Sequence, residues 1–140
     1  MASSPRCVVD TNVLISAGLS PQGVPSQVVE WIIEHGQLLA SESTFAEFAS
    51  RFIEREKFDR YVSRGQREAF VSLVSTEFEM VKVESVPAVS PDPDDDQFLA
   101  LATAGHADAV VTGNTRDFPE QIGGVPVLTP AAFRDRFMST

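Results

Sequence analysis

Hydrophobic residues recur along the chain with two periods that alternate from one segment to the next. Short β-branched or alternating runs predict strands at residues 6–9, 37–40, 78–86, 109–111 and 125–128. Between them, apolar residues spaced three and four apart predict helices at residues 24–35, 41–55, 65–76, 94–104 and 130–137. This alternation predicts an α/β fold with a mostly parallel sheet and helices on both of its faces.

Length and composition favour one ordered domain. A chain of 140 residues is the size of a single domain spanning residues 1–140, and 43% hydrophobic residues is typical of a globular one. No run approaches 18 consecutive apolar residues, so we expect no membrane span. The only cysteine is Cys7 and no secretion signal is recognisable, so we expect a cytoplasmic protein without an internal disulfide.

Acidic residues follow two of the predicted strands and begin one predicted helix. Asp10 ends the first strand, Asp117 follows the strand at 109–111, and residues 92–96 read Asp-Pro-Asp-Asp-Asp before a helix. In a parallel sheet these segments converge on one edge, which is where such sheets bind ligands. Gathered carboxylates repel one another unless a cation neutralises them. Without nearby Cys or clustered His, these oxygen ligands favour Mg²⁺ or Mn²⁺ over Zn²⁺.

Five blocks of sequence, taken in order, resemble those of a PIN domain. They are VVDTNVLI at 8–15, STFAEF at 43–48, PDPDDDQFLALA at 91–102, VTGNTRDF at 111–118 and VPVLTPAAF at 125–133. The nearest likeness is to the branch related to the VapC toxins of toxin–antitoxin systems. The resemblance implies a three-layer α/β/α fold with a five-stranded parallel sheet, and Mg²⁺- or Mn²⁺-dependent endonuclease activity on RNA. It also implies a small antitoxin partner and a homodimer, which apolar residues around Trp31 and Phe70 would support.

The resemblance assigns roles to particular residues. Asp10, Glu47 and Asp96 match the first three acids of the family and would be catalytic. Asp10 and Asp96 would also hold the metal, together with Asp117 and Asn114. The fourth acidic position of the family is commonly an Asp, and here it is Asn114, with Asp117 three residues further on. A neutral amide oxygen in this place would hold a second cation less tightly.

The distribution of charge bears on RNA binding. The chain has a net charge of −9, which argues against simple electrostatic attraction to nucleic acid. Residues 51–67 nevertheless carry six basic residues against three acidic ones. Such a run is typical of a solvated face, but it could also form the rim of an RNA groove. Arg51, Arg55 and Arg116 are the candidate RNA contacts.

Each acidic motif also has a purely structural interpretation. Asp10 could cap a helix, a role compatible with metal binding. Without the resemblance, we would place Glu47 in a capping box as the third residue after a Thr44 cap. The sequence offers no Ser/His/Asp set or Gly-rich phosphate loop. Asn114 leaves open the alternative of a catalytically degenerate PIN-like module that binds RNA or protein.

Overall fold

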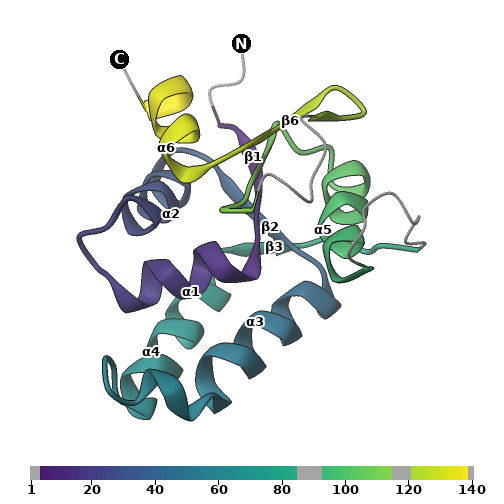
Figure 1. Cartoon of the computed structure of the whole chain (residues 1–140). Coiled ribbons are helices and arrows are strands. Elements are labelled where there is room, and N and C mark those ends of the chain that lie inside the picture. The colour runs from purple at the N-terminus through teal and green to yellow at the C-terminus, as the bar shows by residue number, and fades with distance from the viewer. Residues whose placement is uncertain (1–3, 85–92, 115–120, 139–140) are drawn as a thin grey trace.

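The computed structural model describes residues 4–84, 93–114 and 121–138 (Figure 1). Its sheet has the strand order β3-β2-β1-β4-β6-β5. Five of these strands are parallel, and the two-residue β5 pairs antiparallel with β6. This confirms the five-stranded parallel sheet and adds a short edge strand that the sequence did not predict. The strands are β1 (Arg6–Val9), β2 (Gln37–Ala40), β3 (Phe78–Met80), β4 (Ala109–Val111), β5 (Gln121–Ile122) and β6 (Val125–Leu128).

Helices occupy most of the connections between the strands. They are α1 (Thr11–Leu19), α2 (Val24–His35), α3 (Glu42–Glu54), α4 (Arg64–Ser75), α5 (Pro93–Ala104) and α6 (Pro130–Phe133), with a 3₁₀ turn at Glu56–Phe58 and a π-helical turn at Arg134–Met138. The sequence did not predict α1, which buries Val13, Leu14 and Ile15 in succession and so lacks an amphipathic stripe. The predicted strand at 78–86 ends earlier, at Met80.

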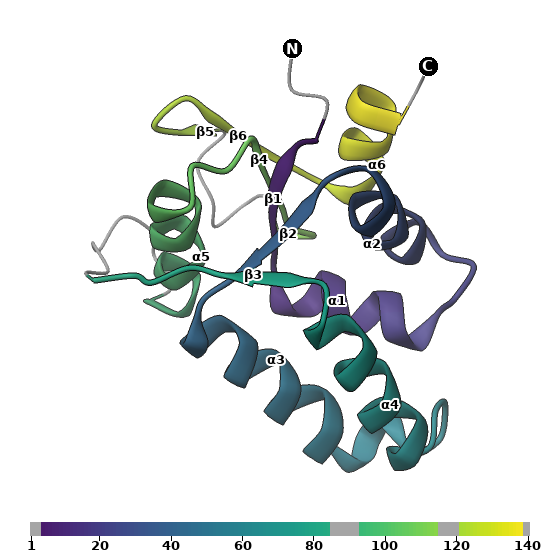
Figure 2. The same ribbon diagram turned by 180° about the vertical axis from the view of Figure 1, so that it is seen from behind.

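Alternate residues of the central strands divide the core into two parts. Cys7, Val9 and Val111 face the core shared with α1, α2, α3, α4 and α6, whereas Val8 and Val110 face α5. Near-continuous burial of β1, β2 and β4 agrees with a parallel sheet covered on both sides. The three-layer α/β/α arrangement is therefore confirmed, and Figure 2 shows the opposite side of the same sheet.

A close approach between α1 and α3 brings two parts of the site together. Gly18 of α1 lies so near the ring of Phe52 of α3 that an added Cβ would come within 2.7 Å of it. A larger residue would force the two helices apart. One end of α1 follows directly from Asp10, so this packing helps to set the distance between the sheet edge and α3.

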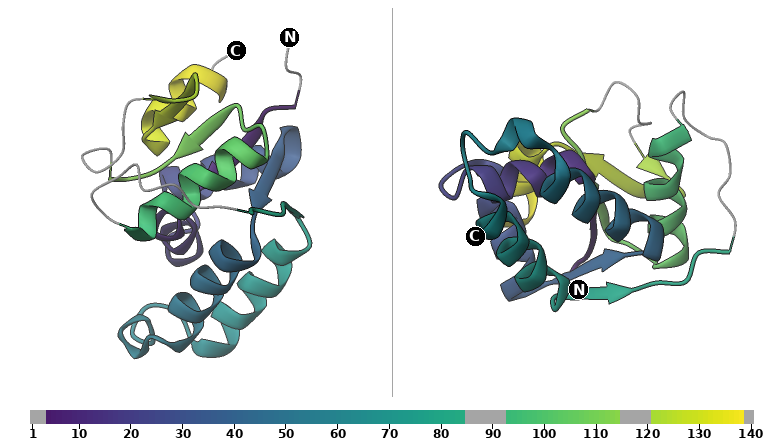
Figure 3. Two further views of the ribbon diagram at one scale, coloured as in Figure 1. Left: turned by 90° about the vertical axis from the view of Figure 1, so that its right-hand side faces the viewer. Right: turned by 90° about the horizontal axis from the view of Figure 1, so that it is seen from below.

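Helices from both layers reach the carboxyl edge of the sheet. The helices α3 and α5 contact each other, and the view from below shows them next to one another at this edge (Figure 3). The edge therefore receives side chains from the strand ends, from α3 and from α5. Among the residues that the structure describes, no helix is long and apolar enough to cross a membrane.

Candidate active site

Asp10 lies at the junction between β1 and α1 and is almost fully buried, with 7% of its surface exposed. Its backbone N–H donates to the carbonyl of Val111 at 3.0 Å, which continues the pairing of β1 with β4. Its Oδ1 accepts from the backbone N–H of Val13 at 2.9 Å, so Asp10 is the N-cap of α1. The helix cap expected as a structural interpretation is thus confirmed, and it leaves Oδ2 directed to other partners.

Thr112 holds the second oxygen of Asp10. The Thr112 hydroxyl donates to Asp10 Oδ2, and Thr112 itself is fully buried just after β4. The backbone N–H of Asn114 donates to Thr112 Oγ1 at 3.1 Å. The segment after β4 is therefore connected to Asp10 by two successive hydrogen bonds, which place Asn114 next to the acid.

Burial makes the charge on Asp10 unfavourable. Loss of solvent raises the pKa of Asp10, and the nearby carboxylate of Glu47 adds to the rise, while hydrogen bonds from Thr112 and Val13 act against it. The net direction is upward. A cation bound at this carboxylate would replace the lost hydration and favour its charged form.

Glu47 projects from α3 toward the start of α1. Its Oε2 accepts a hydrogen bond from the hydroxyl of Thr11, and its Oε1 pairs with Nη2 of Arg51 at 2.8 Å. The capping-box interpretation of Glu47 is wrong. Ser41 is the N-cap of α3, and the third residue of the reciprocal box is Thr44. Glu47 lies about one turn further along α3, does not take part in the cap, and faces the carboxyl edge of the sheet.

Asp96 belongs to the first turn of α5 and is buried, with 4% of its surface exposed. The following residues Phe98 and Leu99 pack against the face of the sheet that carries Val8. This packing fixes the start of α5 at the carboxyl edge, where the ribbon places it beside the end of β1 (Figure 1). Asp10 and Asp96 are thus two buried carboxylates contributed by different layers to the same edge.

Of the remaining candidates, some lie within the described residues and others lie outside them. Arg51 is half-buried and paired with Glu47, whereas Arg55 is exposed at the end of α3. Asp117 and Arg116 lie outside the described residues. Within the described ranges, no group of three or more His, Cys, Asp or Glu side chains is arranged to hold a metal ion. The structure therefore leaves the metal role of these residues as a prediction.

The donor chemistry nevertheless fits a hard divalent cation. Asp10 and Asp96 offer buried carboxylate oxygens, and Glu47 lies close enough to Asp10 to raise its pKa. An uncompensated buried carboxylate is costly, and coordination by a divalent ion is one of the few arrangements that stabilises it. The described part of this edge supplies no Cys or His ligand, which fits Mg²⁺ or Mn²⁺ better than Zn²⁺.

Two threonines of the site carry roles that the sequence analysis did not assign. Thr11 and Thr112 donate their hydroxyl protons to Glu47 and Asp10 respectively, which orients the two carboxylates. Both occur in sequence blocks that resemble the family. Thr11 directly follows Asp10, and Thr112 directly follows the buried strand β4. A polar residue following a buried strand at the same edge is the signal that could have identified Thr112.

Comparison with known proteins agrees with this fold. The family model described as "PIN domain" matches residues 6–116. A chain in the crystal structure of VapBC2 from Rickettsia felis, bound to a DNA fragment from their promoter, has a similar fold with a TM-score of 0.64. The two chains are 14% identical over 87% of this chain and 96% of the other. A comparison with curated proteins finds no match.

Proposed function

The chain belongs to the PIN domain family, and we propose that it is a metal-dependent endoribonuclease that acts as the toxin of a toxin–antitoxin pair. Proteins of this family are generally nucleases. The observation that carries the proposal is the pair of buried carboxylates, Asp10 and Asp96, at one sheet edge, with Glu47 near Asp10. Buried acids are uncommon in structural cores, and the raised pKa of Asp10 is a feature common at catalytic sites.

We assign the metal to Asp10 and Asp96, with Asn114 and Asp117 as further oxygen ligands. A bound Mg²⁺ or Mn²⁺ would supply positive charge at the attacked phosphate and lower the pKa of a coordinated water. The other side chains then act around it. Glu47, held by Thr11 and Arg51, would orient the attacking water and accept its proton. Thr112 would keep Asp10 in its ligating rotamer.

The RNA substrate would reach this edge past the basic end of α3. Arg55 is exposed there, and Arg51 is positioned by Glu47, so both could contact the phosphates that flank the cut. Arg116 is the third proposed contact and comes from the segment after β4. Removal of any one of them should weaken binding without abolishing cleavage, because each contributes a single phosphate contact.

Partners of the chain are also part of the proposal. Likeness to a chain of the VapBC2 complex supports a small antitoxin protein as the binding partner, in the cytoplasm. We also propose a homodimer on the basis of the family. Trp31 and Phe70, which suggested surplus apolar surface, instead pack against Phe133 and Phe52 of the same chain. Light scattering at micromolar concentration tests the dimer, and a monomer mass would contradict it.

One observation favours a second function. Asn114 supplies an amide where the family commonly has a carboxylate, and the described acids do not form a group of three suited to a metal. A PIN-like module that binds RNA or protein without cleaving RNA would retain the fold and would not need a complete set of metal-binding carboxylates. The two functions differ in one measurable respect, which is metal-dependent strand cleavage.

The decisive experiment measures RNA cleavage against Mg²⁺ and Mn²⁺ concentration for the parent and four variants. Asp10→Asn and Asp96→Asn should each reduce the rate about 100-fold or more, as expected for loss of a main electrostatic element. Asn114→Ala should reduce it less, because an amide contributes only a dipole. Asn114→Asp should tighten metal binding and keep cleavage.

Two outcomes would reject the proposal. If Asp10→Asn cleaves as fast as the parent, the carboxylates do not carry the reaction. If the folded parent binds Mn²⁺ and still leaves structured and unstructured RNA intact, the chain is a binding module. The Asn114→Asp variant sharpens the second case, since recovery of cleavage there would locate the defect in the fourth ligand.

A further inference from the structure

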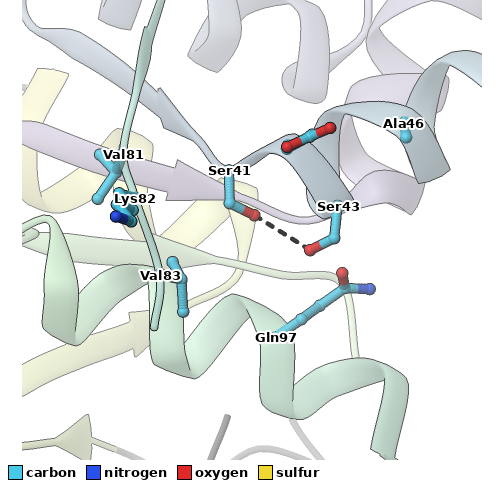
Figure 4. Close-up of a pocket in the computed structure, with 8 residues that line it drawn as sticks. Ser41, Ser43, Ala46, Val81, Lys82, Val83 and Gln97 are labelled. Carbon is cyan, nitrogen blue, oxygen red and sulfur yellow. Dashed lines mark hydrogen bonds between the residues drawn. The ribbon is translucent and has the colours of Figure 1, made fainter. Parts of the chain in front are cut away.

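A cavity of about 610 Å³ lies beside the candidate active site, between α3, α5 and the extended segment that follows β3 (Figure 4). Ser43 and Ala46 line it from α3, Gln97 from α5, and Val81–Val83 from the segment after β3. In Figure 4, Ser43 and Gln97 point toward one another across the opening. The space is open to solvent and large enough for a nucleoside.

The lining is continuous with the catalytic residues. Ala46 directly precedes Glu47 on α3, and Gln97 directly follows Asp96 on α5. Adjacent residues on a helix point about 100° apart, so each helix can turn its acid to the sheet edge and the neighbouring side chain to the cavity. A ligand in the cavity would therefore lie next to the reaction centre without displacing it.

The chemistry of the walls indicates which ligand would bind. Val81, Val83 and Ala46 provide apolar surface, whereas Ser43 and Gln97 provide hydroxyl and carboxamide groups. Among the described residues of the lining, the two charged ones, Lys82 and Glu42, are of opposite sign, so this part of the wall does not attract anions strongly. An apolar wall with a few polar groups suits a base and its ribose better than a phosphate.

We propose that this cavity holds the base and ribose of a single-stranded RNA nucleotide adjacent to the cleaved phosphate, with Gln97 reading the edge of the base. This inference rests on the proposed ribonuclease function. It explains how a chain with a net charge of −9 could bind RNA, since contacts to a base do not depend on overall positive charge. Lys82, which also lines the cavity, would contact a backbone phosphate of this nucleotide.

The test uses the full chain and a matched pair of substitutions. Ala46→Phe puts a ring into the cavity, and Ala69→Phe puts the same ring on the exposed face of α4. Binding of a fluorescein-labelled random single-stranded RNA is measured by anisotropy in the Asp10→Asn background, which prevents cleavage. Ala46→Phe should weaken binding about tenfold or more, the loss typical of one base contact, and Ala69→Phe should not. Thermal melts check that both variants are folded.

Cleavage provides a second readout in the presence of Asp10. Mapping of cut positions in a random RNA should show a base preference next to the cut, and Gln97→Ala should relax it at that position alone. Ala46→Phe should raise KM while kcat changes little. The inference is overturned if Ala46→Phe leaves RNA binding and KM unchanged and Gln97→Ala leaves the base preference unchanged. Failure of the Asp10→Asn chain to bind RNA would overturn it as well. If the parent does not cleave but Ala46→Phe still weakens binding, the cavity remains a nucleotide site and the proposed nuclease function fails.

Discussion

Arg67 and Asp10 are both buried in the described part of this fold, but the surroundings of their charges differ. Arg67 of α4 is 1% exposed, and each guanidinium nitrogen has a partner. It donates to the carbonyls of Phe52, Ile53 and Val62 at 2.8, 3.0 and 2.6 Å and pairs with Asp59 at 2.9 Å. Arg67 therefore satisfies the last carbonyls of α3 and ties α4 to it.

Asp10 has fewer partners that favour its charge. It accepts from one backbone N–H and one hydroxyl, and its pKa is raised by burial and by Glu47. The connection between α3 and α4 thus supplies partners for the charge of Arg67. The carboxyl edge of the sheet, in contrast, leaves the charge of Asp10 only partly compensated. A fully partnered charge is a structural element, and a poorly compensated one is typical of a functional site.

The largest effect is expected at Arg67. Arg67→Met should reduce the free energy of unfolding by about 3–5 kcal/mol, because it leaves three buried carbonyls and one carboxylate without their donor. Urea unfolding followed by circular dichroism measures this loss. Asp59→Asn is the matched control, since Asp59 is exposed and the carbonyl partners of Arg67 remain. A loss below about 1 kcal/mol for Arg67→Met would contradict the structural role.

Addition of metal should produce the next largest change, and in the opposite direction. A cation that binds only the folded chain stabilises it by about 2.7 kcal/mol at 100 times its dissociation constant. Thermal melts in EDTA and in Mn²⁺ should therefore differ for the parent. The shift should disappear in Asp96→Asn and persist in Arg55→Ala, which lies outside the metal site. Identical melts of the parent, together with no heat of Mn²⁺ binding, would remove the metal from the proposal.

The contrast between the two charges also shows what the sequence could predict. The bounds of β1, β2, β4, β6 and α2 agree with the prediction to the residue, because buried runs and a Pro–Gly pair mark their ends. The order of strands and acids predicted that Asp10 and the segment at 92–96 reach one sheet edge, and the resemblance singled out Asp96 within that segment. The structure finds both side chains buried, and their role in the site stays a prediction. Periodicity and motif order are local signals, and these elements depend mainly on local signals.

What could not be predicted depends on contacts distant in sequence. Arg67 stood in a basic run typical of a solvated face, and only the path of α3 and α4 shows that it is buried. The hydroxyl groups that donate to Glu47 and Asp10 belong to Thr11 and Thr112, which lie 36 and 102 residues away from them in sequence. The helix α1 was missed because its burial on several sides removes the amphipathic period.

Asp10→Asn should stabilise the metal-free chain while it abolishes cleavage. Its carboxylate is unfavourable in the folded state, and an amide keeps the hydrogen bond from Val13 without the charge. The gain should be on the order of 1 kcal/mol, as for other substitutions that relieve functional strain. Urea unfolding in EDTA at pH 7 measures it. Equal or lower stability than the parent would mean that the charge is compensated and the contrast with Arg67 is false.

The smallest effect, with the opposite dependence on pH, is expected for the surface pair of Arg6 and Glu79. Arg6 donates to both oxygens of Glu79 at 2.9 and 2.7 Å, and this hydrogen bonding lowers the pKa of Glu79. The side chains of Arg6 and Glu79 are 33% and 45% exposed, so solvent screens their attraction and Glu79→Gln should cost at most about 1 kcal/mol. The contribution of Glu79 is present above its ordinary pKa and is lost as the pH falls through its folded pKa.

The pKa of Asp10 is raised, so its contribution is present below the ordinary value and is lost as the pH rises through the folded pKa. Stability relative to the parent, measured in EDTA from pH 3 to 7, should therefore fall for Glu79→Gln and rise for Asp10→Asn as the pH increases. Salt should reduce the first difference and leave the second nearly unchanged, because solvent ions screen an exposed pair far more than a buried carboxylate. Parallel pH profiles for the two variants would show that the two acids experience the same environment.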